Sequence, residues 1–211
     1  GEEAEGLKEA GIPFEVVPGI TSAISVPAYA GIPLTHRRVA SSFTVVSGSE
    51  DPSKDESSIN WQAVATGGGT LVVLMGWESL SNVTKELMAR GMSPETPAAL
   101  IQWGTRPAQR VVEGTLNTVL ELGRGAGLEP PVVAVFGPVV ELRQRINWFD
   151  NRPLFDKGIM VTRSRSQISA MADLLSREGA NVVELPSIQV VPVEDDRPLR
   201  QAASGLSSYK W

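Results

Sequence analysis

The residues best suited to bind a ligand lie in one stretch, from Val16 to Arg37 (VVPGITSAISVPAYAGIPLTHR). A Pro-Gly pair breaks an apolar, β-prone segment, and Thr21 and Ser22 then supply two hydroxyl groups where a helix would begin. The first backbone N–H groups of a helix have no partner within it, so a ligand can bind there together with the hydroxyl groups. The same pattern fits an ordinary helix cap, and the residues alone leave both interpretations open.

The second half of this stretch ends in cations. Alanines make the predicted helix slim, and Gly31 stands where a left-handed carboxyl-terminal cap belongs. An Ile-Pro-Leu segment then leaves the helix in an extended conformation and presents Arg37 beside Arg38. These two guanidinium groups either meet an anionic ligand or face water, as arginine pairs usually do.

Two further candidates stand at the ends of predicted strands. Met75 closes the run Thr70 to Met75 (TLVVLM), which is typical of a strand buried on both faces. Gly104 follows a strand predicted over 98–102. Because α/β sheets bind ligands beyond the carboxyl ends of their strands, both residues are candidate ligand contacts. Met75 could otherwise fill the core, and Gly104 could simply make the turn.

Composition excludes several kinds of protein and site. The chain has 211 residues, 42% of them hydrophobic, which is typical of a globular protein. It has no cysteine and one histidine, so disulfides, cysteine nucleophiles and metal sites built from several histidines are excluded. No apolar run approaches the roughly 18 residues of a membrane span, and no signal-like segment opens the sequence. We therefore expect a cytoplasmic protein with no membrane partner.

The charge is uneven along the chain. Residues 1–150 carry 11 Lys and Arg against 17 Asp and Glu, whereas residues 151–211 carry 8 against 7, for a net charge of −5. Neither part is a basic platform, so nucleic acid is not expected as a partner. A polyanionic ligand must therefore meet a local cluster such as Arg37 and Arg38.

The predicted elements indicate an α/β fold. Strands are predicted over 14–17, 42–47, 70–75, 98–102, 109–113 and 132–136, and helices over 1–11, 59–65, 77–90 and 115–122. Strands separated mostly by helices predict a layered domain with a mixed sheet and flanking helices.

A second unit is predicted after a connector. The polar, Pro-containing segment from Phe149 to Asp156 predicts a domain boundary, so that 1–150 and 151–211 form separate domains. Beyond it, a strand over 159–162, a helix over 167–178 and a strand over 182–185 that carries on to 193 predict a βαβ unit.

The stretch from Val16 to Arg37 resembles the tetrapyrrole methylase family, above all its uroporphyrinogen-III C-methyltransferases. The resemblance implies S-adenosylmethionine as methyl donor, with the following cofactor contacts: Thr21, Ser22, Met75 and Gly104. It also implies that Glu2 and Arg37 contact the tetrapyrrole, although Glu2 equally fits the solvated first turn of a helix. The family's acid–base candidates belong to a part of the pattern that these residues do not match, so the catalytic residues stay unknown.

Residues 158–163 (GIMVTR) and 179–186 (GANVVELP) resemble the opening of uroporphyrinogen-III synthase. That resemblance implies a partial flavodoxin-like βαβ unit, in which Arg163 either meets propionate groups or lies near the start of a helix. The expected organisation is the carboxyl-terminal half of a methyltransferase over 1–150, fused to the start of a synthase over 151–211. We expect this fusion to be truncated at both ends.

The resemblance also implies an activity. The intact enzyme would move methyl groups from S-adenosylmethionine to C2 and C7 of uroporphyrinogen III, giving precorrin-2 on the way to sirohaem and cobalamin. A homodimer is implied as well. Because the family's Gly-rich cofactor loop has no counterpart in these residues, we expect this chain alone to be inactive. Two alternatives stay open: a non-catalytic dimerisation module, and a protein whose main activity is that of the synthase.

Overall fold

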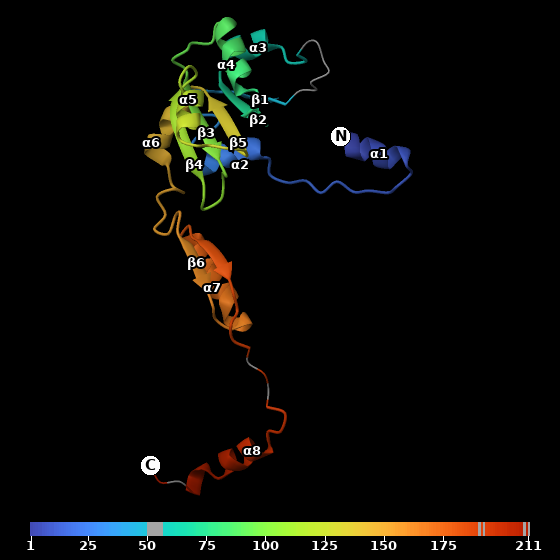
Figure 1. Ribbon diagram of the computed structural model, residues 1–211, viewed down its shortest axis with the longest axis vertical. Coiled ribbons are helices and arrows are strands. Elements are labelled where there is room, and N and C mark those ends of the chain that lie inside the picture. The colour runs from blue at the N-terminus through green and yellow to red at the C-terminus, as the bar shows by residue number, and fades with distance from the viewer. Residues whose placement is uncertain (50–56, 190, 192, 209, 211) are drawn as a thin grey trace.

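The computed structural model describes residues 1–49, 57–189, 191, 193–208 and 210. Its main body is a five-stranded sheet with helices on both faces (Figure 1). The strands are β1 (Phe43–Ser47), β2 (Thr70–Leu74), β3 (Pro97–Gln102), β4 (Arg110–Thr115) and β5 (Val132–Phe136). Most of the polar loop expected over 48–58 lies outside the described residues.

The sheet is mixed, as the sequence predicts. Its strand order is β1-β2-β5-β3-β4, with β1 and β2 parallel and every other neighbouring pair antiparallel. Because β5 runs against β2 and β3, it starts beside their carboxyl ends and finishes beside their amino ends. The sheet therefore has two distinct ends, and both become relevant to binding.

Alternation along the strands builds a core on each face. In β3, Ala98 and Leu100 point to one face, while Ala99 and Ile101 point to the other, because successive strand residues alternate. The first face is covered by α3 (Trp61–Thr66), α4 (Leu80–Ala89) and α5 (Val119–Gly125). The second is covered by α2 (Ser22–Tyr29) and the 3₁₀ helix η1 (Pro138–Leu142), which leads into α6 (Arg143–Ile146).

The strand predicted over 14–17 is wrong. These residues adopt no strand, and Val16 and Val17 are 79% and 87% exposed. A strand forms where a neighbouring backbone pairs its N–H and C=O groups, and no described strand lies beside this segment. The preceding helix, α1 (Glu2–Glu9), has no buried residue and stands apart from the sheet in Figure 1.

The second unit contains the predicted βαβ arrangement. Strands β6 (Gly158–Val161) and β7 (Asn181–Glu184) pair in parallel, and α7 (Arg165–Arg177) connects them. The prediction that the second strand carries on beyond 185 is wrong for the described residues, because β7 ends at Glu184 and residues 185–189 form no strand. Residues 190 and 192 of that prediction lie outside the described residues. The sequence analysis missed α8 (Arg197–Ser204), which has no buried residue and is followed by the short 3₁₀ helix η2 (Leu206–Ser208).

The connector between the two units packs against the main body. Phe149 is buried, and its ring centroid lies 4.8 Å from that of Tyr29 at the end of α2. The Trp148 indole N–H donates to the Ala28 carbonyl at 3.1 Å. The connector is therefore anchored at its start, and the domain boundary stays a prediction. In the part of the chain that the structure describes, no helix combines the length and apolar character needed to cross a bilayer.

Candidate functional site

A cavity of about 650 Å³ opens at the end of the sheet where β2 and β3 finish and β5 begins. Its walls come from the start of α2, the turns after β2 and β3, and the start of β5. The lining residues are Ser22, Val26, Leu74, Met75, Trp77, Glu78, Ile101, Trp103, Gly104, Arg106, Pro130, Pro131, Val132 and Val133. The cavity thus lies where an α/β sheet is expected to bind a ligand.

The start of α2 supplies one wall. Thr21 is the N-cap, and its hydroxyl oxygen accepts a hydrogen bond from the Ala23 backbone N–H at 3.2 Å. Ala23 and Val26 are buried against the sheet and fix the helix, while Ser22 lines the cavity. The predicted helix start is confirmed. The Thr21 hydroxyl serves as a cap, so Ser22 is the hydroxyl residue of the pair that lines the cavity.

The turns after β2 and β3 carry unusual backbone conformations. Met75, Trp103 and Thr105 have φ values of 52°, 51° and 71°, a region that residues other than glycine rarely adopt. Such conformations persist where the surrounding structure holds them, and they concentrate at functional sites. The Met75 side chain is 70% exposed, so it does not fill the core.

Gly104 allows the second turn to approach α2 closely. A Cβ atom added at this position would lie 2.4 Å from Cγ1 of Val26, far inside normal contact. The sequence left open whether this glycine serves a close approach or simply a turn. The structure assigns it a close approach, and the neighbouring group is a helix side chain that also lines the cavity.

The sequence analysis missed most of the lining residues, among them two tryptophans and two charged side chains. Trp77 and Trp103 are large aromatic surfaces, and Glu78 and Arg106 are the charged residues of the wall. The Arg106 guanidinium carbon lies 5.3 Å from the Trp103 ring centroid, as in a cation–π contact. The two tryptophans could have been predicted from their positions, because each lies next to a glycine at the end of a predicted strand.

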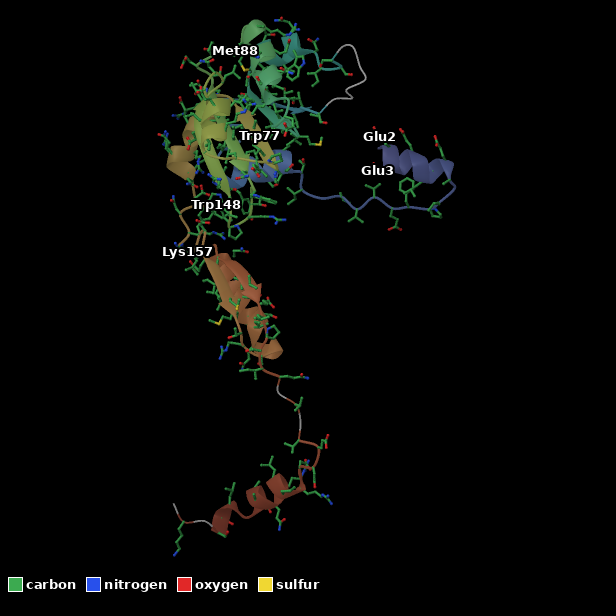
Figure 2. The ribbon with its side chains drawn as sticks, in the orientation of Figure 1. Glu2, Glu3, Trp77, Met88, Trp148 and Lys157 are labelled. Atoms are coloured by element: carbon green, nitrogen blue, oxygen red, sulfur yellow. The ribbon has the colours of Figure 1, made fainter. Side chains whose placement is uncertain are left out.

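The structure does not bring the two predicted substrate contacts to this cavity. Glu2 lies on α1, and Figure 2 shows it apart from Trp77 and the sheet. Arg37 lies near the opposite end of the sheet, because the nearby Leu34 carbonyl accepts a hydrogen bond from Thr70 at the start of β2. At that end, a second, more polar hollow of about 660 Å³ is lined by Arg38, Val39, Pro138, Glu141, Leu142, Gln144 and Arg145.

The arrangement favours binding through apolar and aromatic contacts with few charges. Ser22, Met75 and Gly104 converge on one cavity, and Thr21 adjoins Ser22. Among the described residues, no group of three or more His, Asp or Glu side chains is placed to hold a metal ion. The cavity is therefore suited to an organic ligand with a flat apolar portion.

Comparison with known families identifies the fold. Residues 1–120 match the family model described as tetrapyrrole (corrin/porphyrin) methylases. The chain belongs to this family. A solved methylase is similar in structure: the uroporphyrin-III C-methyl transferase of Thermus thermophilus complexed with S-adenyl homocysteine. The TM-score is 0.56 at 34% identity, over 67% of this chain and 60% of that one.

The relatives that this chain matches are longer than the chain itself. The S-adenosyl-L-methionine-dependent uroporphyrinogen III methyltransferase of Methanosarcina barkeri is 51% identical over 142 residues, 67% of this chain and 56% of the relative. The porphyrin biosynthesis protein HemD of Ruminiclostridium josui is 37% identical over 211 residues, 100% of this chain and 42% of the relative. The chain thus spans about half the length of the curated relatives it matches.

Proposed function

We propose that this chain forms the methyl-donor side of an S-adenosylmethionine-dependent methyltransferase. Its substrate would be uroporphyrinogen III, methylated at C2 and C7 to precorrin-2 for sirohaem and cobalamin synthesis in the cytoplasm. The observation that carries the proposal is the convergence of Ser22, Met75 and Gly104 on one cavity at the strand ends. Family membership and the uroporphyrinogen methyltransferases among its relatives support it.

The cavity fits a donor of this chemistry. Bound S-adenosylmethionine supplies a methyl group on a positively charged sulfur, next to a flat purine and an amino-acid tail. The apolar wall and the Trp103 ring suit the purine, and Glu78 and Arg106 offer opposite charges for the tail. The Ser22 hydroxyl, the Met75 side chain and the Gly104 backbone would orient the donor, so the chain contributes mainly by positioning.

The substrate contacts belong to the same proposal. Arg37 is exposed and carries a guanidinium group suited to carboxylates, and it precedes Arg38, which lines the second hollow. It lies near the sheet end opposite the donor cavity, so it would bind a peripheral carboxylate of the tetrapyrrole and not the reacting ring. Glu2 would reach the substrate only if α1, which has no buried residue, packed against the main body.

We propose further that residues 151–211 belong to a fused uroporphyrinogen-III synthase. The parallel β6-α7-β7 unit supports this, as does the match of HemD over the whole chain. Because the chain spans about half of its relatives, we expect no turnover from it alone. A role in dimerisation is the second candidate, favoured by the apolar and exposed Val16, Val17 and Ile20.

A methyl-transfer assay tests the proposed function. The chain alone and a chimera carrying the part of the M. barkeri relative that lies outside the match are mixed with uroporphyrinogen III and labelled donor. We expect labelled product from the chimera and none from the chain. A folded chimera that binds the donor but transfers no methyl group would contradict the substrate assignment. A chimera with no donor binding would contradict the cavity assignment.

A further inference from the structure

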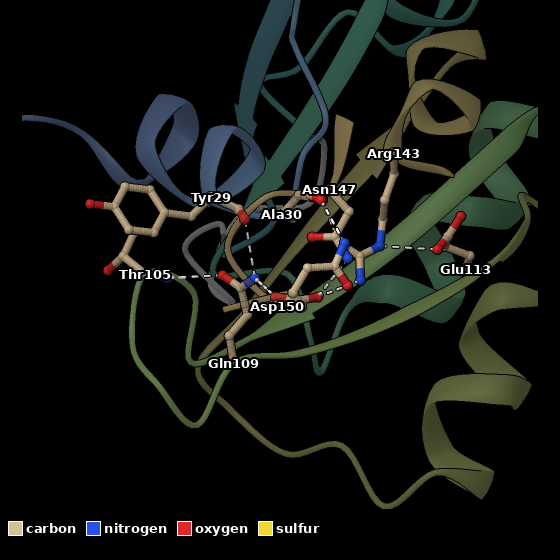
Figure 3. A network of polar contacts seen from close by, with 9 residues as sticks. Tyr29, Ala30, Thr105, Gln109, Glu113, Arg143, Asn147 and Asp150 are labelled. Carbon is tan, nitrogen blue, oxygen red and sulfur yellow. Dashed lines mark hydrogen bonds and ion pairs between the residues drawn. The ribbon is translucent and has the colours of Figure 1, made fainter. Parts of the chain in front are cut away.

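A buried polar network joins the connector to the turn after β3 (Figure 3). Its centre is Gln109, which precedes β4 and is 3% exposed. The Gln109 side-chain amide donates through Nε2 to Asp150 Oδ1 at 2.8 Å, and its Oε1 accepts from the Thr105 backbone N–H at 3.0 Å. One side chain therefore contacts both the connector and the turn whose residues line the cavity.

The chemistry of the partners fixes which way the amide points. An ionised carboxylate such as Asp150 only accepts hydrogen bonds, so the NH₂ end of Gln109 must face it. The same NH₂ group lies 3.4 Å from the Tyr29 carbonyl oxygen, which also only accepts. The oxygen of the amide is thereby left for Thr105, whose N–H only donates.

Asp150 is itself held in place by Arg143. The guanidinium donates to Asp150 Oδ2 at 2.5 Å, to Glu113 Oε1 at 3.0 Å and to the Ala30 carbonyl at 2.5 Å. The Arg143 and Asp150 side chains are only 11% and 16% exposed, so their charges pair where little water reaches them. The cation that holds the Asp150 carboxylate is therefore itself fixed by two other acceptors, Glu113 and the Ala30 carbonyl.

The turn needs such support. Trp103 and Thr105 both have positive φ values, which are unfavourable for residues with a Cβ atom. The hydrogen bond from the Thr105 N–H to Gln109 holds Thr105 in place. The adjacent Trp103 and Gly104 form part of the cavity wall. A change in the amide orientation of Gln109 would release the turn and alter the wall.

We propose that Gln109 is a positioning residue that couples the connector at Asp150 to the ligand cavity. It transmits the position of Asp150 to the Trp103–Thr105 turn through the two ends of one amide. Movement of the connector, and of whatever follows it, would thus change ligand affinity without any contact to the ligand. The ligand used in the test rests on the proposed function, whereas the coupling itself does not.

The test uses the whole chain and reverses the donor and the acceptor of the hydrogen bond between Gln109 and Asp150. In Gln109→Glu, two carboxylates face each other. In Asp150→Asn, the carboxylate that orients the amide is lost, and Arg143 keeps only Glu113 as a charged partner. In the double variant, the new amide at 150 donates to the new carboxylate at 109, which still accepts from Thr105. The long contact to the Tyr29 carbonyl at 3.4 Å is not restored, so recovery should be incomplete. Glu113→Gln is the matched control, because it touches Arg143 but not Gln109.

Two readouts are followed: NMR signals of the Thr105 amide and the Trp103 indole, and affinity for S-adenosylhomocysteine. Both single variants should shift the two signals and weaken binding by roughly fivefold, while the double variant restores both to within about twofold, as coupled pairs do. The control should change neither. Unchanged Thr105 signals in the single variants, or a folded double variant without recovery, would overturn the inference.

The coupling can still be tested if the wild-type chain does not bind the ligand or if the single variants do not fold. If the wild-type chain fails to bind S-adenosylhomocysteine, the proposed donor site fails, and the NMR signals still decide the coupling. If the single variants do not fold, hydrogen exchange of the wild-type chain decides instead. The Thr105 amide should then exchange far more slowly than the unbonded amides of the same turn, and rapid exchange would overturn the inference.

Discussion

The two sheets of this chain are built from the same local pattern but differ in how much they bury. In the five-stranded sheet, helices cover both faces, and Leu100 in β3 is fully buried. In the two-stranded sheet, α7 is the described helix that connects and packs on the strands, and Met160 and Val183 are 60% and 50% exposed. An apolar run followed by an amphipathic helix therefore predicts a strand–helix unit, but neighbouring elements determine its burial.

The same difference determines where a well-defined cavity can form. The walls of the cavity lined by Ser22, Met75 and Gly104 stand on strands that are paired on both sides, so turns with unfavourable backbone conformations can be held there. A smaller hollow of about 290 Å³ in the second unit is lined in part by Arg163. Positioning of a reactive ligand is accordingly expected from the first unit.

The largest expected effect comes from removing a core side chain in each sheet. Leu100→Ala should lower the free energy of unfolding by about 2–5 kcal/mol, because it leaves a cavity in a packed core. Met160→Ala should lower it by less than about 1 kcal/mol, since most of that side chain already contacts water. Unfolding in urea measures both free energies. Tryptophan fluorescence follows the unfolding of the Leu100→Ala variant, and circular dichroism follows that of the Met160→Ala variant. Equal losses would contradict the comparison.

A single added methyl group should distinguish the two units as well. Gly104→Ala should cost about 1–3 kcal/mol, because the new Cβ would overlap Val26, and it should weaken donor binding. Gly158→Ala in β6 is the control, since no heavy atom lies within 4 Å of its added Cβ. Adding Val26→Ala to Gly104→Ala should recover part of the loss. Thermal unfolding of the wild-type chain and these three variants checks this, and no recovery would show that the overlap is not the cause.

The smallest effect on stability is expected from exposed arginines, one in each unit. Arg37→Ala and Arg163→Ala should each change the free energy of unfolding by less than about 0.5 kcal/mol, because both side chains face water. In the active chimera, Arg37→Ala should raise the KM for uroporphyrinogen III while leaving S-adenosylhomocysteine binding intact. If only Arg163→Ala raised the KM for uroporphyrinogen III, the substrate contact would have to be assigned to the second unit.

Much of the sheet could be predicted because the amino-acid composition of its strands indicates that they are buried. Runs such as TLVVLM and VVAVF consist of β-branched or apolar residues at every position, which fits strands covered on both faces. The segment over 14–17 has the same β-prone character, yet it forms no strand. Pairing with another backbone decides the outcome, and a local pattern does not contain that information.

The candidate site could be predicted only in part, for a related reason. Ser22, Met75 and Gly104 were found because each stands at an element boundary, where chain geometry itself points to a ligand. The link between Gln109 and Asp150 spans 41 residues, and neither side chain is exceptional in its own surroundings. Long-range polar contacts of this kind depend on the assembled fold, and so does the placement of Arg37 away from the cavity.

The most direct test of the account is an NMR titration of the whole chain with S-adenosylhomocysteine. We predict millimolar affinity, with shifts confined to residues that line the cavity, including Ser22, Met75, Trp103 and Gly104. Arg38 and Arg145 at the other end of the sheet serve as the internal control and should not respond. Shifts centred on those arginines, or no shift in the cavity at saturating ligand, would contradict the claim that this cavity is the methyl-donor site.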